Sequence, residues 1–223
     1  MTTEAAGAGA SVTLKLATSL DGRIATAAGE SRWITGSQAR EAVHRLRAEH
    51  DAVLVGVETA LADDPELTVR LEDYTGPQPA RVVLDSRQRL AETCRLAASA
   101  REIPTYVVSV EPPQARLTAA GVRVVEVEAT EGGRADLESV VAALAALGLR
   151  RLFVEGGGQV AASFLRCGLV DRLEWFRAPV VIGGEGRPAV GALALSALAE
   201  APRFARLDVR SVGDDLWERY ERI

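Results

Sequence analysis

Short runs rich in β-branched residues alternate along this chain with amphipathic stretches, which is the pattern of an α/β protein. Strands are predicted over residues 12–17, 52–55, 81–84, 105–110, 123–127, 151–154, 172–178, 206–211 and 216–222. The last two flank Val212-Gly213-Asp214-Asp215, a sequence typical of a hairpin turn. Because strands joined by a hairpin run antiparallel, we expect a mixed, mostly parallel sheet that ends in an antiparallel C-terminal hairpin.

Apolar positions that recur at helical spacing predict helices, which we expect on both faces of the sheet. The first begins at Ser37, which we expect to be its N-cap. The second begins after the N-cap Asp136 and ends at Gly148, and the third covers about residues 159–167. The apolar face of the first helix consists of Ala39, Ala42, Val43 and Leu46.

The remaining segments predict loops and a single domain. Residues 71–80, 128–135 and 182–188 have loop composition, and no internal repeat or long linker divides the chain. At 223 residues the chain can bury a full core. We expect a disordered tail over residues 1–10 and one domain over residues 11–223.

Composition excludes several classes of protein. A net charge of −5, without a basic stripe, argues against nucleic-acid binding, and no apolar run reaches the length of a membrane span. Without a secretory signal pattern, we expect a cytoplasmic protein. Cys94 and Cys167 lack metal-site spacing, and Cys167 is expected to be buried. His44 and His50 lie on a predicted surface helix, so a transition-metal site is not expected.

The segment from residue 61 to 70 combines two adjacent aspartates with a proline and an arginine. Asp63 and Asp64 precede Pro65, and Arg70 follows closely. Because a residue before proline avoids the helical region, Asp64 should end the preceding apolar segment, and Asp63 should project from a turn into a cleft. A turn acid beside a solvated arginine is the simpler interpretation of this motif when it stands alone.

Here it does not stand alone. Upstream are Val-Thr-Leu-Lys-Leu-Ala-Thr-Ser-Leu-Asp-Gly-Arg-Ile-Ala (12–25) and Gly-Glu-Ser-Arg-Trp-Ile-Thr (29–35); downstream are Arg-Val-Val-Leu-Asp-Ser-Arg (81–87) and Leu-Phe-Val-Glu-Gly-Gly-Gly (152–158). In this order the motifs closely resemble the pyrimidine reductase of riboflavin biosynthesis, from about Ser11 to the C-terminus. The resemblance implies a dihydrofolate-reductase-like three-layer fold, NADPH as cofactor and a homodimer. The zinc deaminase signature that precedes many such reductases is absent from this sequence, so we expect reduction alone.

A glycine-rich turn before a helix, as in residues 155–158, can present free N–H groups and a positive helix end to a phosphate. A structural connection is the simpler alternative. The resemblance implies that Glu155 faces the substrate and that the cofactor pyrophosphate binds along residues 157–163. The cofactor-binding residues expected there include Gly157, Gly158, Gln159, Val160 and Ala161.

Further site residues follow from the resemblance. Ser86 is expected to bind the adenosine 2′-phosphate, with Arg87 as a possible second contact. The simpler alternative is a β-turn that begins at Asp85. Periodicity alone would make Arg47 a solvated helical arginine, and Trp33 would by default be a core anchor. The resemblance instead assigns two groups of residues: Ser31, Arg47, Leu67 and Arg70 to the substrate, and Ala17, Trp33 and Thr59 to the cofactor.

Lys15 lies in a predicted strand, on the face opposite Leu14 and Leu16. A buried lysine is costly unless it is paired, which favours an ion pair with Asp63; a surface lysine on an edge strand is the alternative. We therefore expect Asp63 and Lys15 to be the catalytic residues.

The expected activity is NADPH-dependent reduction of 5-amino-6-(5-phosphoribosylamino)uracil, or of its diamino counterpart, to a ribityl product. Residues 175–179, Trp-Phe-Arg-Ala-Pro, depart from the more aliphatic strand associated with the family. A related aminopyrimidine or imine of a natural-product pathway therefore stays open as substrate. A nucleotide-binding regulator without catalysis is the alternative from another class, and pterin reduction fits the motifs less well.

Overall fold

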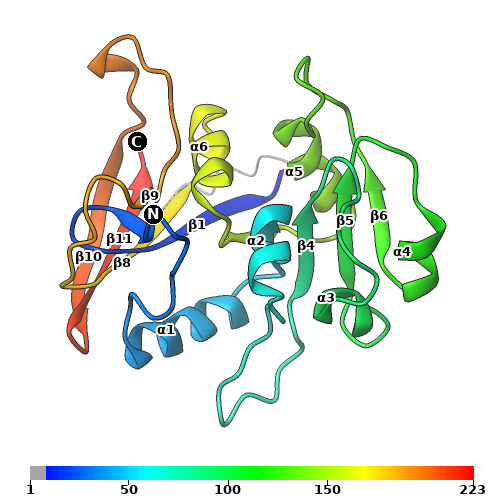
Figure 1. The fold of residues 1–223 in the computed structure, drawn as a ribbon, viewed down its shortest axis with the longest axis horizontal. Coiled ribbons are helices and arrows are strands. Elements are labelled where there is room, and N and C mark those ends of the chain that lie inside the picture. The colour runs from blue at the N-terminus through cyan, green and yellow to red at the C-terminus, as the bar shows by residue number, and fades with distance from the viewer. Residues whose placement is uncertain (1–8) are drawn as a thin grey trace, which may run out of the picture.

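The computed structural model describes residues 9–223, and its strands form one large sheet and one small one (Figure 1). Within these residues the large sheet has nine strands in the order β10-β11-β8-β1-β7-β3-β4-β5-β6, and β2 pairs with β9. The strands are β1 (Ser11–Thr18), β2 (Arg23–Ala25), β3 (Ala52–Gly56), β4 (Ala80–Leu84), β5 (Thr105–Ser109), β6 (Arg123–Glu126), β7 (Arg151–Val154), β8 (Arg172–Arg177), β9 (Arg187–Pro188), β10 (Phe204–Val212) and β11 (Asp215–Arg222).

The large sheet is parallel except at its C-terminal edge. Neighbouring strands from β8 across to β6 run parallel, whereas β11 is antiparallel to both β8 and β10. The turn between β10 and β11 brings Val212 opposite Asp215, and Gly213 there has a φ of 68°, which glycine adopts without strain. The predicted mixed sheet and its C-terminal hairpin are confirmed.

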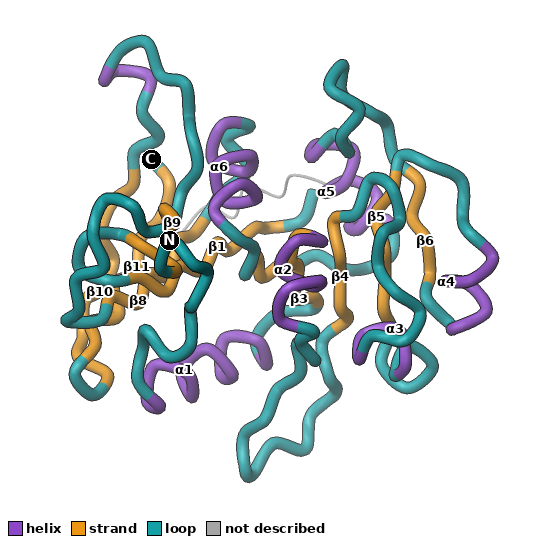
Figure 2. The backbone as a smooth tube through the Cα atoms, in the orientation of Figure 1, coloured by secondary structure: helices purple, strands orange, loops and turns teal. Residues whose placement is uncertain are grey.

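Helices cover both faces of this sheet, as expected (Figure 2). Side chains alternate along each strand, so Leu54 of β3 enters one core and its neighbours Val53 and Val55 enter the other. The first core includes α5 and α6, and the second includes α1, α2, α3 and α4. The helices are α1 (Ser37–Ala48), α2 (Val57–Asp63), α3 (Arg95–Ala98), α4 (Ala115–Ala120), α5 (Leu137–Ala146) and α6 (Gly158–Arg166), with a short 3₁₀ helix at Leu198–Glu200.

The helix ends agree with the sequence at α5 and α6 but not at α1. Asp136 caps α5 by accepting a hydrogen bond from the N–H of Ser139 at 2.9 Å, and Gly168 follows α6 with a φ of 64°. The N-cap of α1 is Gly36, so the prediction of Ser37 was wrong. The N–H of Gly36 instead donates to the buried carboxylate of Asp215 at 2.7 Å, a partner on the distant strand β11 that local sequence does not reveal.

The elements missing from the prediction are short. The strands β2 and β9, and the helices α2, α3 and α4, contain too few residues for a periodic pattern to emerge. The small β2–β9 sheet joins the turn after β1 to the segment 182–191. Asp21 strengthens that junction by accepting the N–H groups of Ile182 and Gly183, and its pKa is lowered to about 2 by Ser19 and these two bonds.

Two further predictions concern the N-terminal tail and the burial of Cys167. The expected tail lies outside the described residues except for Gly9 and Ala10, and Ala10 packs against the first core. Cys167 is exposed rather than buried, because it follows the last residue of α6. None of the helices within residues 9–223 combines the length and the apolar character required to cross a bilayer.

Candidate active site

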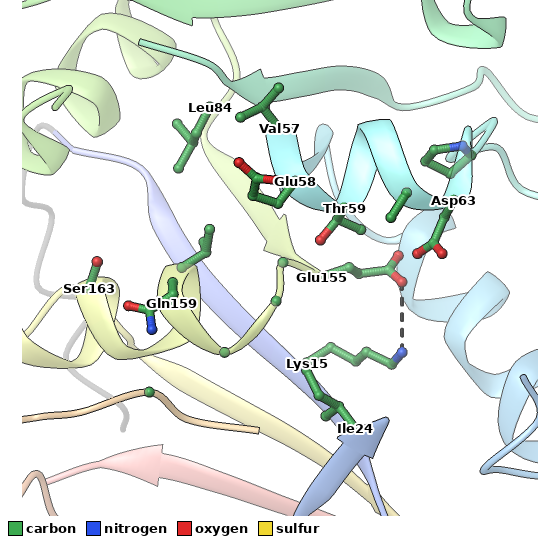
Figure 3. A pocket seen from close by; sticks show the side chains of 18 of the residues that line it. Lys15, Ile24, Val57, Glu58, Thr59, Asp63, Leu84, Glu155, Gln159 and Ser163 are labelled. Carbon is green, nitrogen blue, oxygen red and sulfur yellow. Dashed lines mark ion pairs between the residues drawn. The ribbon is translucent and has the colours of Figure 1, made fainter. Parts of the chain in front are cut away.

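A cleft of about 1570 Å³ opens at the carboxyl ends of β1, β3, β4 and β7. Open α/β sheets bind ligands at this edge, where several strands end side by side. Figure 3 shows Lys15 and Glu155 pointing toward each other, while Thr59 and Asp63 extend from α2 toward the same space. The cleft thus brings together residues that are far apart in the sequence.

Three charged side chains meet in this cleft. Glu155, immediately after β7, accepts two hydrogen bonds from Arg47 of α1, with Nε–Oε1 at 2.5 Å and Nη2–Oε2 at 3.1 Å. Lys15 Nζ lies 3.8 Å from Glu155 Oε2. The Arg47 and Glu155 side chains are 11% and 8% exposed, so Arg47 is not the solvated residue that periodicity alone indicated.

Burial and mutual attraction shift the pKa values within this cluster. Burial lowers the pKa of Lys15, and Arg47 lowers it further, whereas Glu155 acts in the opposite direction. Burial would raise the pKa of Glu155, but Arg47 and Lys15 outweigh that effect and lower it. The carboxylate is therefore held ionised, and the lysine releases its proton more readily than a solvated lysine.

The expected ion pair between Lys15 and Asp63 is absent from the described residues, because the partner of Lys15 is Glu155. In the register of the sheet, Leu14 pairs with Val154, so the next residues on β1 and after β7 lie side by side. Asp63 is the last residue of α2 and lines the same cleft. Its place in the cleft agrees with the sequence analysis, and its catalytic role stays a prediction.

Asp64 ends α2 in the left-handed conformation, with φ 40° and ψ 57°, as expected of a residue before proline that stops a helix. Its Oδ1 accepts a hydrogen bond from the N–H of Arg95 at 2.9 Å, at the start of α3. The carboxylate thus bonds to a helix that is distant in the sequence and not to its own turn. Asp64 joins two elements of the fold.

The segment from Pro65 to Arg70 contributes to the lining of the cleft. Leu67 is buried at a φ of 56°, which is unusual for a branched side chain, and Arg70 lines the cleft. Arg47 Nη1 donates to the carbonyl of Thr68 at 2.8 Å, so the residue that binds Glu155 also holds this segment. The predicted substrate residues Arg47, Leu67, Arg70 and Glu155 are thus brought together.

The glycine-rich turn, which follows Glu155 directly, also lines the cleft. Gly157 is the N-cap of α6, and no acceptor for the N–H groups of Gly156 or Gly157 is found within residues 9–223. A Cβ at Gly158 would lie 2.4 Å from the carbonyl oxygen of Pro188, so only glycine fits there. Free N–H groups at a positive helix end suit a phosphate.

All the remaining predicted residues except Ala161 line the cleft. Trp33 is 71% exposed, with the Arg40 guanidinium 4.3 Å from its ring centroid, so it is no core anchor. Ala161 is fully buried, does not line the cleft, and donates its N–H to Gly157. The predicted residues found along the cleft also include Ala17, Ser31, Thr59, Ser86, Arg87, Gly157, Gly158, Gln159, Val160 and Ser163.

Ser86 and Asp85 line the cleft and also form hydrogen bonds that hold neighbouring loops. The Ser86 hydroxyl accepts the N–H of Ala135 at 3.0 Å and so fixes the end of the 128–135 loop. The buried Asp85 side chain accepts the N–H of Leu90 at 2.8 Å, and the Asp85 carbonyl accepts the N–H of Gln88 at 3.0 Å. Asp85 therefore does begin a turn, as the simpler interpretation of this motif predicted.

The two histidines do not occupy the exposed helix surface that we expected. His50 lies beyond the end of α1, with its Nε2 3.0 Å from Thr13 Oγ1 and its ring against Phe153. His44 lines the cleft beside the segment 65–70. Its spacing of three residues from Arg47 places both on one side of α1, and that signal was available in the sequence.

The model of the RibD C-terminal domain family matches residues 10–217 of this chain. The chain belongs to this family. Its relatives include the riboflavin biosynthesis protein RibD of Bacillus amyloliquefaciens, which is 35% identical over 92% of this chain and 55% of that protein. The 2,5-diamino-6-ribosylamino-4(3H)-pyrimidinone 5′-phosphate reductase of Methanothermobacter thermautotrophicus is 38% identical over 94% of this chain and 96% of the relative.

Solved structures show the same fold. RibD of Acinetobacter baumannii, form 2, superposes with a TM-score of 0.85 at 33% identity, over 97% of this chain and 58% of that one. The riboflavin biosynthesis reductase Rib7 of Saccharomyces cerevisiae, at 20% identity and a TM-score of 0.76, shares the fold. The dihydrofolate-reductase-like architecture is confirmed. The chain spans about half the length of the RibD proteins that it matches.

Proposed function

We propose that this protein is an NADPH-dependent reductase of riboflavin biosynthesis. Its substrate is 5-amino-6-(5-phosphoribosylamino)uracil, or the diamino counterpart, and its product carries a ribityl chain. The observation that carries the proposal is the Lys15–Glu155–Arg47 cluster in the cleft. Membership of the RibD C-terminal domain family, and a full-length relative named as a pyrimidinone 5′-phosphate reductase, support it.

The cleft suits a dinucleotide cofactor. At the start of α6 the N–H groups of Gly156 and Gly157 have no acceptor among the described residues and can bind a pyrophosphate, and Ser86 and Arg87 follow β4 where a 2′-phosphate can be bound. When bound, NADPH supplies the hydride. We expect NADPH to bind at least tenfold tighter than NADH, about 1.4 kcal/mol, with calorimetry as the measurement. Equal dissociation constants for the two cofactors would contradict the assignment of Ser86 and Arg87.

The reaction requires groups that bind the substrate and move a proton. The ribosylamine ring opens to an imine at C1′, and reduction adds a hydride to C1′ and a proton to nitrogen. Lys15 is suited to supply a proton because burial lowers its pKa. Glu155 keeps Lys15 and Arg47 in place, and Asp63, at the end of α2, is a further acidic group that lines the cleft. Arg47 and Arg70 are the cations suited to the substrate phosphate.

The experiment is an assay of NADPH consumption with the aminopyrimidine as substrate and identification of the product by mass spectrometry. Stoichiometric consumption with formation of a ribityl product is the expected result. Lys15→Met should abolish turnover while NADPH binding persists. NADPH consumption that does not depend on the aminopyrimidine would contradict the proposal.

The sequence feature that favoured a different substrate lies away from the cleft. Trp175 faces the first core, donates its Nε1–H to Thr18 Oγ1 at 2.8 Å and does not line the cleft. Phe176 is fully buried and stacks on Trp217, with ring centroids 5.2 Å apart. The unusual Trp-Phe pair therefore supports packing at the C-terminal edge and gives no reason to prefer a natural-product substrate.

A further inference from the structure

His44 occupies a position between α1 and the segment 65–70 for which the proposed reaction gives no role. Its Nδ1 lies 3.1 Å from the carbonyl oxygen of Thr68 and 3.2 Å from the backbone nitrogen of Arg70. One turn along the same helix, Arg47 donates to that same Thr68 carbonyl at 2.8 Å. Two side chains of α1 therefore hold the backbone of the segment that carries Arg70.

The hydrogen-bond partners around Nδ1 favour one tautomer of His44. The Thr68 carbonyl accepts a hydrogen bond from Arg47, whereas the N–H of Arg70 finds no acceptor other than Nδ1 within residues 9–223. A proton on Nε2 therefore gives both backbone groups a partner, whereas a proton on Nδ1 would leave the Arg70 N–H without one among these residues. We assign this neutral tautomer to His44.

The surroundings of His44 keep this imidazole neutral. Burial lowers its pKa to about 4, and the positive charges of Arg47 and Arg70 add to that effect, whereas the charge of Glu155 and the hydrogen bond that a protonated Nδ1 would donate to the Thr68 carbonyl oppose it. These three residues come from α1, the segment 65–70 and the end of β7, the elements that surround the ring. At neutral pH the Nδ1 lone pair is therefore available as an acceptor.

We propose that His44 is a positioning residue, which accepts the backbone N–H of Arg70 through Nδ1 and thereby fixes the Arg70 guanidinium over the substrate end of the cleft. This inference rests on the proposed function for the identity of the substrate. The bond to the Arg70 backbone exists independently of that identity. Arg70 needs this anchor, since its side chain is 56% exposed and its ion pair with Glu66, at 3.5 Å, is on the surface.

Loss of the anchor should weaken substrate binding more than it slows the chemical step. A freed segment 65–70 samples more conformations, and Arg70 must be ordered again whenever substrate binds. His44→Ala should raise KM for the phosphorylated substrate by roughly three- to tenfold, the scale of one lost hydrogen bond, and change kcat less. Asparagine at position 44 offers an acceptor close to the place of Nδ1, so His44→Asn should recover most of the affinity.

The test compares His44→Ala, His44→Asn and the control His50→Ala. His50 is also partly buried, but it bonds to Leu46 and Thr13 away from the cleft, so its loss should affect stability and leave KM unchanged. In an Arg70→Ala background, His44→Ala should have little further effect on KM. Equal KM values for wild type and His44→Ala, or failure of His44→Asn to recover affinity, would overturn the proposal.

Amide hydrogen exchange provides a readout that needs no substrate. A peptide covering residues 66–74 should exchange faster in His44→Ala than in wild type or His44→Asn, and His50→Ala should leave it protected. Unchanged exchange in His44→Ala would refute the anchoring role. If exchange changes as expected while the wild type fails to reduce the aminopyrimidine, the proposed function fails and the anchor stands.

Discussion

At the scale of single residues, Glu155 determines the charge balance of the cleft. It is the shared anion of two buried cations, with Lys15 at 3.8 Å and Arg47 at 2.5 Å. Removing one member of a buried charge cluster leaves the others without compensation, which costs more than the cluster contributes when it is intact. Substitution of Glu155 should therefore lower both the stability of the fold and the activity.

We expect Glu155→Gln to lower the free energy of unfolding at neutral pH by about 3 kcal/mol, as measured by urea denaturation. Glu58→Gln is the matched control: it removes an exposed carboxylate that faces the same cleft beside Arg89, and should cost little. In the folded protein the pKa of Glu155 lies below its ordinary value of 4.5. The ionised carboxylate therefore contributes fully to the free energy of unfolding above pH 4.5, and this contribution is lost as the pH falls through the lowered pKa. The difference between wild type and Glu155→Gln should therefore shrink in acid; a constant difference would contradict the account.

The adjacent aspartates make a second test possible, because their surroundings differ. Asp63→Asn should keep the fold and cofactor binding but reduce turnover by ~10²-fold or more, the usual scale for a positioned proton-transfer or orienting group. Asp64→Asn should leave most activity and lower the melting temperature modestly, because it weakens the bond to Arg95 at the start of α3. Steady-state assays and thermal melts of both variants decide the roles. The reverse ranking would show that Asp64 is the functional acid.

At the residue scale the sequence predicted which side chains gather in the cleft better than it predicted their partners. Lys15, Asp63 and Glu155 were all expected there, yet Lys15 pairs with Glu155 because of the register between β1 and β7. Register joins residues about 140 positions apart and leaves no local trace in the sequence. His44 was missed although its spacing of three residues from Arg47 places both side chains on one side of the predicted helix.

At the scale of elements, the turn into α6 is held by contacts that tolerate no side chain. A methyl group at Gly158 would lie 2.4 Å from the Pro188 carbonyl, an atom of the backbone segment tied to β2. Gly158→Ala should therefore displace the start of α6 or the segment 182–191. We expect NADPH to bind at least tenfold more weakly, about 1.4 kcal/mol, by calorimetry.

Gly184→Ala is the matched control for that change. Gly184 lies in the same segment, but a Cβ there would meet no atom within 4 Å, and its φ is not in the left-handed region. This variant should bind NADPH as tightly as wild type. If both variants bind alike, α6 does not form the cofactor site in the way we propose.

Long elements were predicted well, and short ones were missed for a physical reason. The strands of the large sheet and the helices α1, α5 and α6 carry periodic apolar positions long enough to recognise. The helices α2, α3 and α4 and the strands β2 and β9 are held mainly by tertiary contacts, such as the bond from Arg95 to Asp64 at the start of α3. Stabilisation of that kind depends on the finished fold.

At the scale of the whole molecule, the C-terminal edge of the sheet exposes apolar side chains. Leu198 is 82% exposed in the segment 191–201, and Leu207 and Val209 are exposed on the edge strand β10. Exposed apolar surface of this kind is typical of a protein–protein interface. We predict a symmetric homodimer that covers this region, in which Leu198→Glu shifts the mass measured by light scattering toward the monomer. A wild-type monomer at micromolar concentration would refute the prediction.

We propose that this cleft transfers a hydride from NADPH to C1′ of a phosphoribosylaminopyrimidine. NADPH deuterated at the transferred position of the nicotinamide ring tests this transfer when the product is analysed by mass spectrometry and NMR. We expect a ribityl product with one deuterium, bound to C1′, and no such product from Lys15→Met. A product without deuterium, or with deuterium on the pyrimidine ring, would show that the hydride does not pass from NADPH to C1′ in this cleft.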